Sequence, residues 1–242
     1  MWTANFGAIG NDVALQMVRT FLALTSAECT PSDAQNNIKQ CLHDASGRTR
    51  FHNGAVYAAV GEVLTYMLCN PSPVASLFIN CEQCGITKIN SNMNFVNDIS
   101  TVGHTTIAEY FKHFQTEKTL RTCPNCKRCQ KVLKSFNEPP KLLVFNNDLN
   151  ILHPSKTVKV ICGNNSSQVQ MSLRGVIYHV NQNHFASRVI TADKEVYFTD
   201  GMINNGHPTN EGKLADISIK ELTYYKYDHQ KHPAVAVIYA RQ

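Results

Sequence analysis

Two pairs of cysteines carry the most specific chemistry in this chain of 242 residues. Cys81 and Cys84 are separated by two residues in "CEQCG", and Cys123 and Cys126 are spaced in the same way in "CPNC". At this spacing two thiolates can converge on one tetrahedral Zn²⁺ ion, while nearby backbone N–H groups offset their negative charge. Two such pairs complete a Cys₄ site with no open position for water. The spacing therefore predicts a structural zinc ion.

The segment between the two pairs, 85–122, is longer than the corresponding segment of a compact zinc ribbon. The metal would therefore join the two ends of a long inserted segment. Cys129 lies three residues after Cys126 and could replace one of the ligands. The alternative is that the paired cysteines are free or buried thiols. The lone cysteines are interpreted in that way; they are Cys29, Cys41, Cys69 and Cys162.

His184 and Asp200 form a second candidate site. His184 begins the strand-like run "HFASRVI", Asp200 ends the run "EVYFTD", and the turn-forming "TADKE" lies between them. In an antiparallel hairpin the carboxylate could orient the imidazole, as catalysis by a side-chain nucleophile requires. Two alternatives stay open. A histidine taken alone is more often a surface residue, and Thr199 would replace Asp200 if the register slipped by one residue.

Helices are expected before the sites and strands around them. The periodicity predicts helices over 11–24, with Asn11 or Asp12 as the cap, and from Ser32 or Asp33 to residue 43. A third, apolar helix is expected over 53–68, and a later one over 107–114 with Thr105 or Thr106 as its cap. After "NPSP", β-branched and aromatic runs predict strands; they cover 74–80, 141–148, 158–163, 169–180, 184–190, 195–201 and 234–241. Helices followed by strands indicate the α+β class.

The composition narrows the function classes. Hydrophobic residues at 43% and charged residues at 17% are typical of a globular chain, and a net charge of +5 without a basic block argues against nucleic acid as a partner. The N-terminus lacks the pattern of a signal peptide, and no apolar window is long enough for a membrane span. The nine cysteines are odd in number, which favours metal over disulfides. We therefore expect a soluble intracellular protein, cytoplasmic or nuclear.

The motifs occur in an order that resembles the ubiquitin-specific proteases (USPs), which are papain-like cysteine proteases. The cysteine pairs with the following "KRCQKVLKSFNEPPKLLVF" resemble the zinc-bearing fingers of that family. "NHFASRVI", "EVYFTDGM" and "AVAVIYAR" resemble its histidine, aspartate and closing strands, with Asn183 in place of the usual glycine and Phe185 in place of the usual tyrosine. The papain-like proteases of coronaviruses share this architecture, and the sequence resembles them about as well.

The resemblance implies a single USP-like domain over 1–242. It would consist of a helical thumb (1–72), zinc-binding β fingers (73–137) and an antiparallel β palm (138–242). The resemblance also implies binding of ubiquitin or a ubiquitin-like modifier, with His184 as catalytic base and Asp200 as its orienting partner. A cysteine at the start of the first helix would be the nucleophile, because the helix N-terminus and the imidazole lower its pKa.

That cysteine is missing from the corresponding stretch, "GAIGNDVALQMVRTFL". If the Gly-Asn of the family motif is aligned with Gly10 and Asn11, Val13 occupies the nucleophile position. Two other registers place Ala8 or Ala14 there. Neither valine nor alanine has an ionisable atom, so we expect a modifier-binding domain without peptidase activity.

Three alternatives remain open at this point. An alanine at Ala8 or Ala14 would be an inactivating substitution in an active deubiquitinase, in a deSUMOylase or in a viral papain-like protease. The chain could instead be a structural zinc domain of a larger polypeptide or complex. Cys29 and Cys41 are poor substitutes for the nucleophile, because Cys29 precedes a helix start by several residues and Cys41 lies near a helix end.

Overall fold

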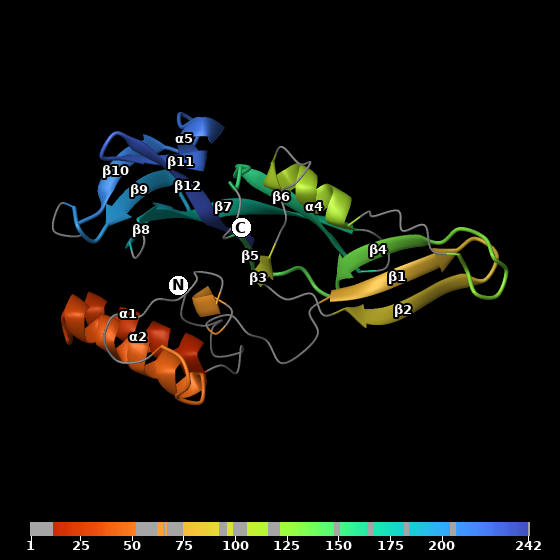
Figure 1. Cartoon of the computed structure of the whole chain (residues 1–242), viewed down its shortest axis with the longest axis horizontal. Coiled ribbons are helices and arrows are strands. Elements are labelled where there is room, and N and C mark those ends of the chain that lie inside the picture. The colour runs from red at the N-terminus through yellow and green to blue at the C-terminus, as the bar shows by residue number, and fades with distance from the viewer. Residues whose placement is uncertain are drawn as a thin grey trace. The chain divides into compact units, whose positions relative to one another are not determined.

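The computed structural model describes residues 12–51, 62–64, 66, 75–91, 96–98, 106–115, 122–147, 151–163, 167–181, 184–203 and 207–241 (Figure 1). The chain divides into two compact units, Met1–Ser72 and Pro73–Gln242. Among the helices in these described ranges, none combines the length and the hydropathy that crossing a membrane requires.

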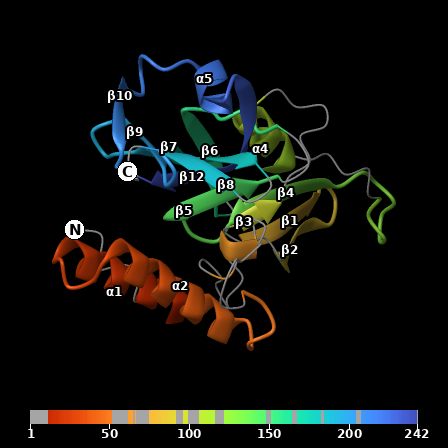
Figure 2. The same cartoon turned by 60° about the vertical axis from the view of Figure 1, so that its left-hand side comes forward.

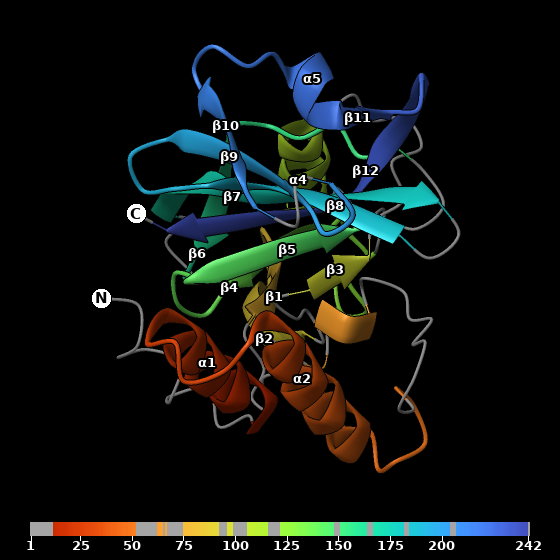
Figure 3. The same ribbon diagram turned by 90° about the vertical axis from the view of Figure 1, so that its left-hand side faces the viewer.

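The first unit is built on two helices, α1 (Asp12–Thr25) and α2 (Pro31–Ala45), which lie side by side (Figures 2 and 3). Val13, Leu42 and Phe51 form its buried hydrophobic cluster. The predicted third helix, 53–68, lies mostly outside the described residues, although 62–64 and 66 are helical.

The cap of α2 is Thr30, so the predicted caps Ser32 and Asp33 are wrong. Thr30 Oγ1 accepts the Asp33 N–H at 3.2 Å, and Asp33 Oδ2 accepts the Thr30 N–H at 3.1 Å. This reciprocal capping box leaves Pro31 at the first helical position, where its missing N–H costs no hydrogen bond.

The second unit is organised by a mixed sheet, which contains twelve strands within the described residues. The strands are β1 (Ala75–Cys81), β2 (Gly85–Ser91), β3 (Val96–Asp98), β4 (Lys131–Phe136), β5 (Leu142–Asn146), β6 (Thr157–Cys162), β7 (Ser167–Asn181), β8 (His184–Ile190), β9 (Glu195–Asp200), β10 (Thr209–Lys213), β11 (Tyr224–Tyr227) and β12 (Gln230–Arg241). Their order is β10-β9-β8-β7-β6-β4-β1-β2, while β12 pairs with β5, β7 and β11 and β3 pairs with β5. The pairings β3–β5 and β4–β6 are parallel, and the other described pairings are antiparallel.

Two helices accompany the sheet, α4 (Ile107–Gln115) and α5 (Ile219–Thr223). Of the two caps predicted for α4, Thr106 is the one that the structure uses, because its Oγ1 accepts the Glu109 N–H at 3.2 Å. All seven predicted strand regions are strands. The seven predicted runs did not include α5 or the strands β2, β3, β4, β10 and β11.

The core of the second unit lies around β7 and β12, which pair with each other near the centre of the sheet (Figure 3). Tyr178 and Tyr239 are the largest side chains buried there. Tyr239 packs edge to face on Phe145, with ring centroids 5.9 Å apart, and its hydroxyl accepts the Ser155 N–H at 3.0 Å. Burial raises the pKa of Tyr239, so its hydroxyl remains a neutral partner for that N–H.

Strands β1, β2 and β4 form a three-stranded antiparallel ribbon that extends away from the rest of the sheet (Figure 1). Strand β1 lies in the middle and ends at Cys81. Gly85 opens β2 with φ +88°, a left-handed conformation that glycine adopts without steric cost. The tight turn between Cys81 and Gly85 therefore lies at the far end of the ribbon.

Candidate metal centre and histidine–aspartate pair

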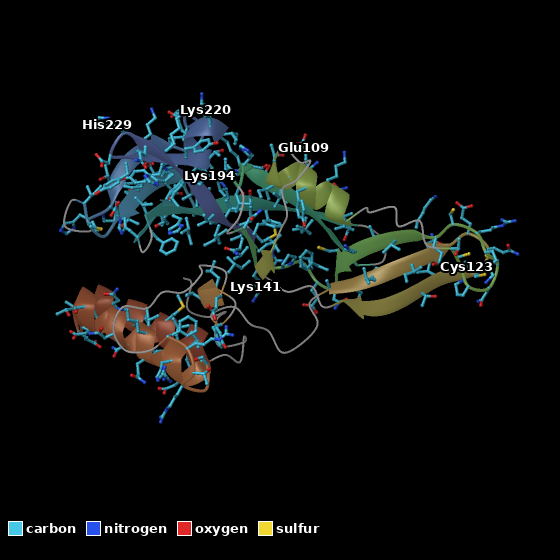
Figure 4. The ribbon with its side chains drawn as sticks, in the orientation of Figure 1. Glu109, Cys123, Lys141, Lys194, Lys220 and His229 are labelled. Carbon is cyan, nitrogen blue, oxygen red and sulfur yellow. The ribbon has the colours of Figure 1, made fainter. Side chains whose placement is uncertain are left out.

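The far end of the ribbon brings the four paired cysteines together, as Figure 4 shows around Cys123. Their sulfur atoms all lie within 4.8 Å of one another. The Sγ atoms of Cys81 and Cys126 are 3.3 Å apart, and those of Cys84 and Cys123 are 3.8 Å apart. A zinc ion bonded to four sulfurs at about 2.3 Å requires sulfur–sulfur separations of about 3.8 Å. The cluster therefore has the dimensions of a tetrahedral Cys₄ zinc site.

The electrostatics of the cluster also fit a cation. The backbone N–H groups of Cys126 and Asn125 lower the pKa of the Cys123 thiol to about 6. The neighbouring sulfurs of Cys126 and Cys123 raise the pKa of the Cys84 thiol to about 12. Four adjacent thiols thus resist losing all their protons together, and a divalent cation at their centre would remove that resistance. Cys129 is exposed and lies outside the cluster.

His184 and Asp200 meet at the open end of the hairpin that β8 and β9 form. The strands are antiparallel, as predicted, and the hydrogen bond from His184 Nε2 to Asp200 Oδ1 is 2.7 Å long. The His184 side chain is 18% exposed, whereas that of Asp200 is fully buried. An imidazole that donates through Nε2 keeps its lone pair on Nδ1, so Nδ1 is the atom that could take a proton from a nucleophile.

The backbone after Asp200 fixes its carboxylate. Oδ1 also accepts the Met202 N–H at 2.9 Å, which closes a turn directly after β9. The register of the hairpin places Asp200 opposite Ala186 and Thr199 opposite Ser187. Asp200, and not Thr199, is therefore the residue that contacts the imidazole.

Ala186 is a residue that the sequence analysis missed. It is buried and lies directly opposite Asp200 in the hairpin. His184 is two residues before Ala186 in β8 and therefore lies on the same face of the sheet, diagonally across from Asp200. Its small side chain leaves room for the carboxylate to reach diagonally toward the imidazole. A small residue two positions after a candidate histidine, together with the hairpin register, was the available signal.

We expect Ala186→Leu to separate His184 from Asp200, because the longer side chain would fill the space that the carboxylate crosses. Overpacking of this kind costs about 1–3 kcal/mol, measurable as a lower midpoint of urea unfolding. Ser187→Leu is the matched control at the adjacent, half-buried position on the opposite face of β8 and should lower stability less than Ala186→Leu does. Equal effects of the two substitutions would contradict this role of Ala186.

The three candidate nucleophile positions lie in the first unit. Val13 is the second residue of α1 and is 1% exposed, within the hydrophobic cluster of that unit. Ala14 follows it in the first turn of α1, and Ala8 lies outside the described residues. Cys29 directly precedes Thr30, the cap of α2, so the expectation that it lies several residues before a helix start is wrong. Cys41 lies in the last turns of α2.

Comparison with known proteins identifies the fold. No protein-family model and no curated protein matches the sequence. Among solved structures, a chain of the SAGA DUB module Ubp8/Sgf11/Sus1/Sgf73 bound to monoubiquitin aligns with a TM-score of 0.50 at 12% identity, over 87% of this chain and 53% of that chain. The same module bound to ubiquitin aldehyde aligns with a TM-score of 0.51 at 12% identity, over 87% and 54%.

A third structure, the module with shortened Sgf11, aligns with a TM-score of 0.53 at 10% identity, over 100% of this chain and 67% of that chain. The chain thus spans about half the length of the first two matching chains. At such identities the similarity concerns the fold alone. The chain has a fold of the ubiquitin-specific protease type, with a mixed sheet, accompanying helices and a four-cysteine cluster that could hold a metal ion.

Proposed function

We propose that this chain is a USP-type domain that binds ubiquitin or a ubiquitin-like modifier and does not cleave it. The observation that carries the proposal is the His184–Asp200 hydrogen bond of 2.7 Å in a USP-like fold whose N-terminal region has no cysteine before Cys29. Two solved structures with this fold are of modules bound to monoubiquitin and to ubiquitin aldehyde. In this proposal His184 is the base, Asp200 is its orienting carboxylate, and the nucleophile is missing.

In this proposal the three regions divide the work of recognition. Residues 1–72 act as the helical thumb, 73–137 as the fingers and 138–242 as the palm. The fingers contact the globular body of the modifier, and the thumb and the palm each contribute contacts to its C-terminal tail. Cys81, Cys84, Cys123 and Cys126 would hold a structural zinc ion, which supplies rigidity and no reaction step because all four positions are taken by thiolates.

The residues that remain would support acyl transfer if a cysteine stood at the start of α1. His184 Nδ1 would take the thiol proton and later give it to the leaving amine, while Asp200 holds Nε2–H in place. Backbone N–H groups at the helix start would stabilise the oxyanion of the thioester pathway. With Val13, Ala14 or Ala8 at that position there is no thiol proton to take.

The packing of Val13 supports a natural loss of the nucleophile. A buried valine beside Leu42 and Phe51 contributes apolar burial to the first unit, which a substitution made only to remove a thiol would not be expected to do. Substituted cysteines at Ala8 or Ala14, in a cellular protease or in a viral one like those of coronaviruses, are the competing explanation. Cleavage at a site that resembles a ubiquitin tail would indicate the viral type.

Binding tests the proposal directly. We expect titration calorimetry with a panel of ubiquitin-family proteins to yield one modifier that binds the full chain in the micromolar range. A modifier that lacks its C-terminal tail should bind more weakly, because the contacts with thumb and palm are lost. If no member forms a complex at high micromolar concentration, the chain is better explained as a structural zinc domain of a larger assembly. The proposal places the protein in the cytoplasm or the nucleus.

A further inference from the structure

An ion pair with a buried guanidinium and a partly exposed carboxylate lies on the same face of the β8–β9 hairpin as His184 and Asp200. Arg188 of β8 is 8% exposed and forms two hydrogen bonds with the Glu211 carboxylate of β10, Nε to Oε2 at 2.6 Å and Nη2 to Oε1 at 3.0 Å. Its Nη1 donates to the Tyr178 hydroxyl at 2.8 Å and to the Glu221 carbonyl at 2.9 Å. The guanidinium is therefore held by strands β7 and β10 and by helix α5.

Glu211 reaches Arg188 because β10 contains a bulge. The pairing of β10 with β9 shifts between Asn210 and Gly212, so Glu211 is the extra residue and has no directly opposite partner. Asn210 Oδ1 accepts the Gly212 N–H at 2.7 Å, and Gly212 has φ +98°, where an L-residue would be strained. The local sequence Asn-Glu-Gly thus builds a turn within the strand that redirects one carboxylate.

Strand β9 lies between β8 and β10, so the Arg188–Glu211 pair spans it. The guanidinium lies 5.7 Å from the ring centroid of Phe198, which is directly opposite Arg188 and two residues before Asp200. The Phe198 ring also stacks on the Tyr225 ring, with their centroids 4.5 Å apart. Burial, followed by the negative charge of Asp200, raises the pKa of Tyr225, which indicates that this ring also lies near the carboxylate.

We infer that the Arg188–Glu211 pair is a positioning device for the His184–Asp200 pair. The pair holds Phe198 in place, and with it the end of β9 that carries Asp200. The Asp200 carboxylate is thereby kept within hydrogen-bond distance of His184 Nε2. The pair gains little net stability, because the buried guanidinium loses its hydration while the Glu211 carboxylate stays partly in water. Its main effect is geometric, because the two parallel hydrogen bonds between Arg188 and Glu211 restrict how β8 and β10 lie relative to each other. The inference rests on the proposed role of His184, but it concerns the state of the imidazole itself.

The test reads the ring of His184 without modifier and without turnover. Long-range ¹H–¹⁵N spectra of the labelled full chain, with His184→Gln to assign the signal, should show a single tautomer that is protonated on Nε2. In Glu211→Ala and Arg188→Met we expect loss of that single-tautomer signature. Arg188→Lys keeps the charge without the bidentate contact and should give an intermediate spectrum.

The matched control is Tyr239→Phe, which removes a buried hydroxyl bonded to Ser155 N at 3.0 Å elsewhere in the same unit. It should lower the Tm and leave the His184 signal unchanged. An unchanged His184 signal in folded Glu211→Ala would overturn the inference and assign the ion pair to stability alone. If Glu211→Ala does not fold, Glu211→Gln, which keeps the side-chain shape, decides in the same way. A failure to bind any modifier would contradict the proposed function and leave this result unaffected.

Discussion

One of the variants Ala14→Cys, Ala8→Cys and Val13→Cys is expected to hydrolyse C-terminal fluorogenic amides of a ubiquitin-family modifier, whereas the parent chain shows no turnover. Positions 13 and 14 lie in the first turn of α1, where the positive end of the helix favours a thiolate. Val13 is buried in the hydrophobic cluster, so its apolar surroundings would raise the pKa of a thiol at that position. The base and its carboxylate are in hydrogen-bond contact before any change is made, since His184 Nε2 and Asp200 Oδ1 are 2.7 Å apart. The variant would therefore add the one missing group.

The restored activity should depend on the imidazole. We expect the variant that turns over to lose activity by about 10⁴-fold or more when His184→Ala is added, as when the base of a nucleophile–base pair is removed. The three variants are measured in parallel, and the one variant that turns over identifies the register. If none does while each still binds the modifier, the chain has lost its catalytic geometry. Activity of the parent above its own His184→Ala control would contradict the proposal that it is inactive.

Loss of the metal site should have the second largest effect, and it would be seen in stability. Zinc binding to small Cys/His domains contributes about 10–16 kcal/mol of apparent free energy, which is available only to the folded site. We expect the purified chain to contain one zinc ion by elemental analysis and Cys123→Ser to contain none. The Tm should fall by about 10 °C or more, since about 1 kcal/mol shifts the Tm of a chain of this size by about 2–4 °C. A chelator should reproduce this result with the parent chain.

Cys129→Ser provides the matched control for the zinc site. Cys129 lies in the same loop as Cys123 and Cys126 but is exposed and outside the cluster, so its replacement should preserve both the zinc content and the Tm. A loss of zinc in Cys129→Ser would show that this residue is a ligand in solution. Retention of zinc in Cys123→Ser would indicate that Cys129 can take its place.

The sequence by itself determined the features that depend on neighbouring residues. Each CxxC pair converges within one turn, so the identity of the four thiols could be predicted from spacing. The hairpin of β8 and β9 follows from two strand-like runs joined by the four residues 191–194, and its open end brings His184 to Asp200. Most helices and seven strand regions carry their period in the chain itself. That residues 1–28 contain no cysteine is likewise visible without a structure.

Strands with little local signal were beyond that analysis. Strand β10, "TNEGK", is polar and exposed, and it is a strand because β9 offers it hydrogen-bond partners. Strand β2 shows no strong apolar alternation and is held by its register with β1. The cap of α2 was misplaced by two or three residues because Ser32 and Asp33 compete with Thr30, and Pro31 decides between them by its missing N–H.

The tertiary structure alone decided which distant residues meet. It places the C-terminal strand β12 between β5 and β7, excludes Cys129 from the four-thiol cluster, and directs Glu211 across β9 to Arg188. These outcomes depend on long-range register, which is the sum of many side-chain contacts with no mark in any one segment. Turns, caps and ligand spacings act over a few residues, and for that reason the chain displays them directly.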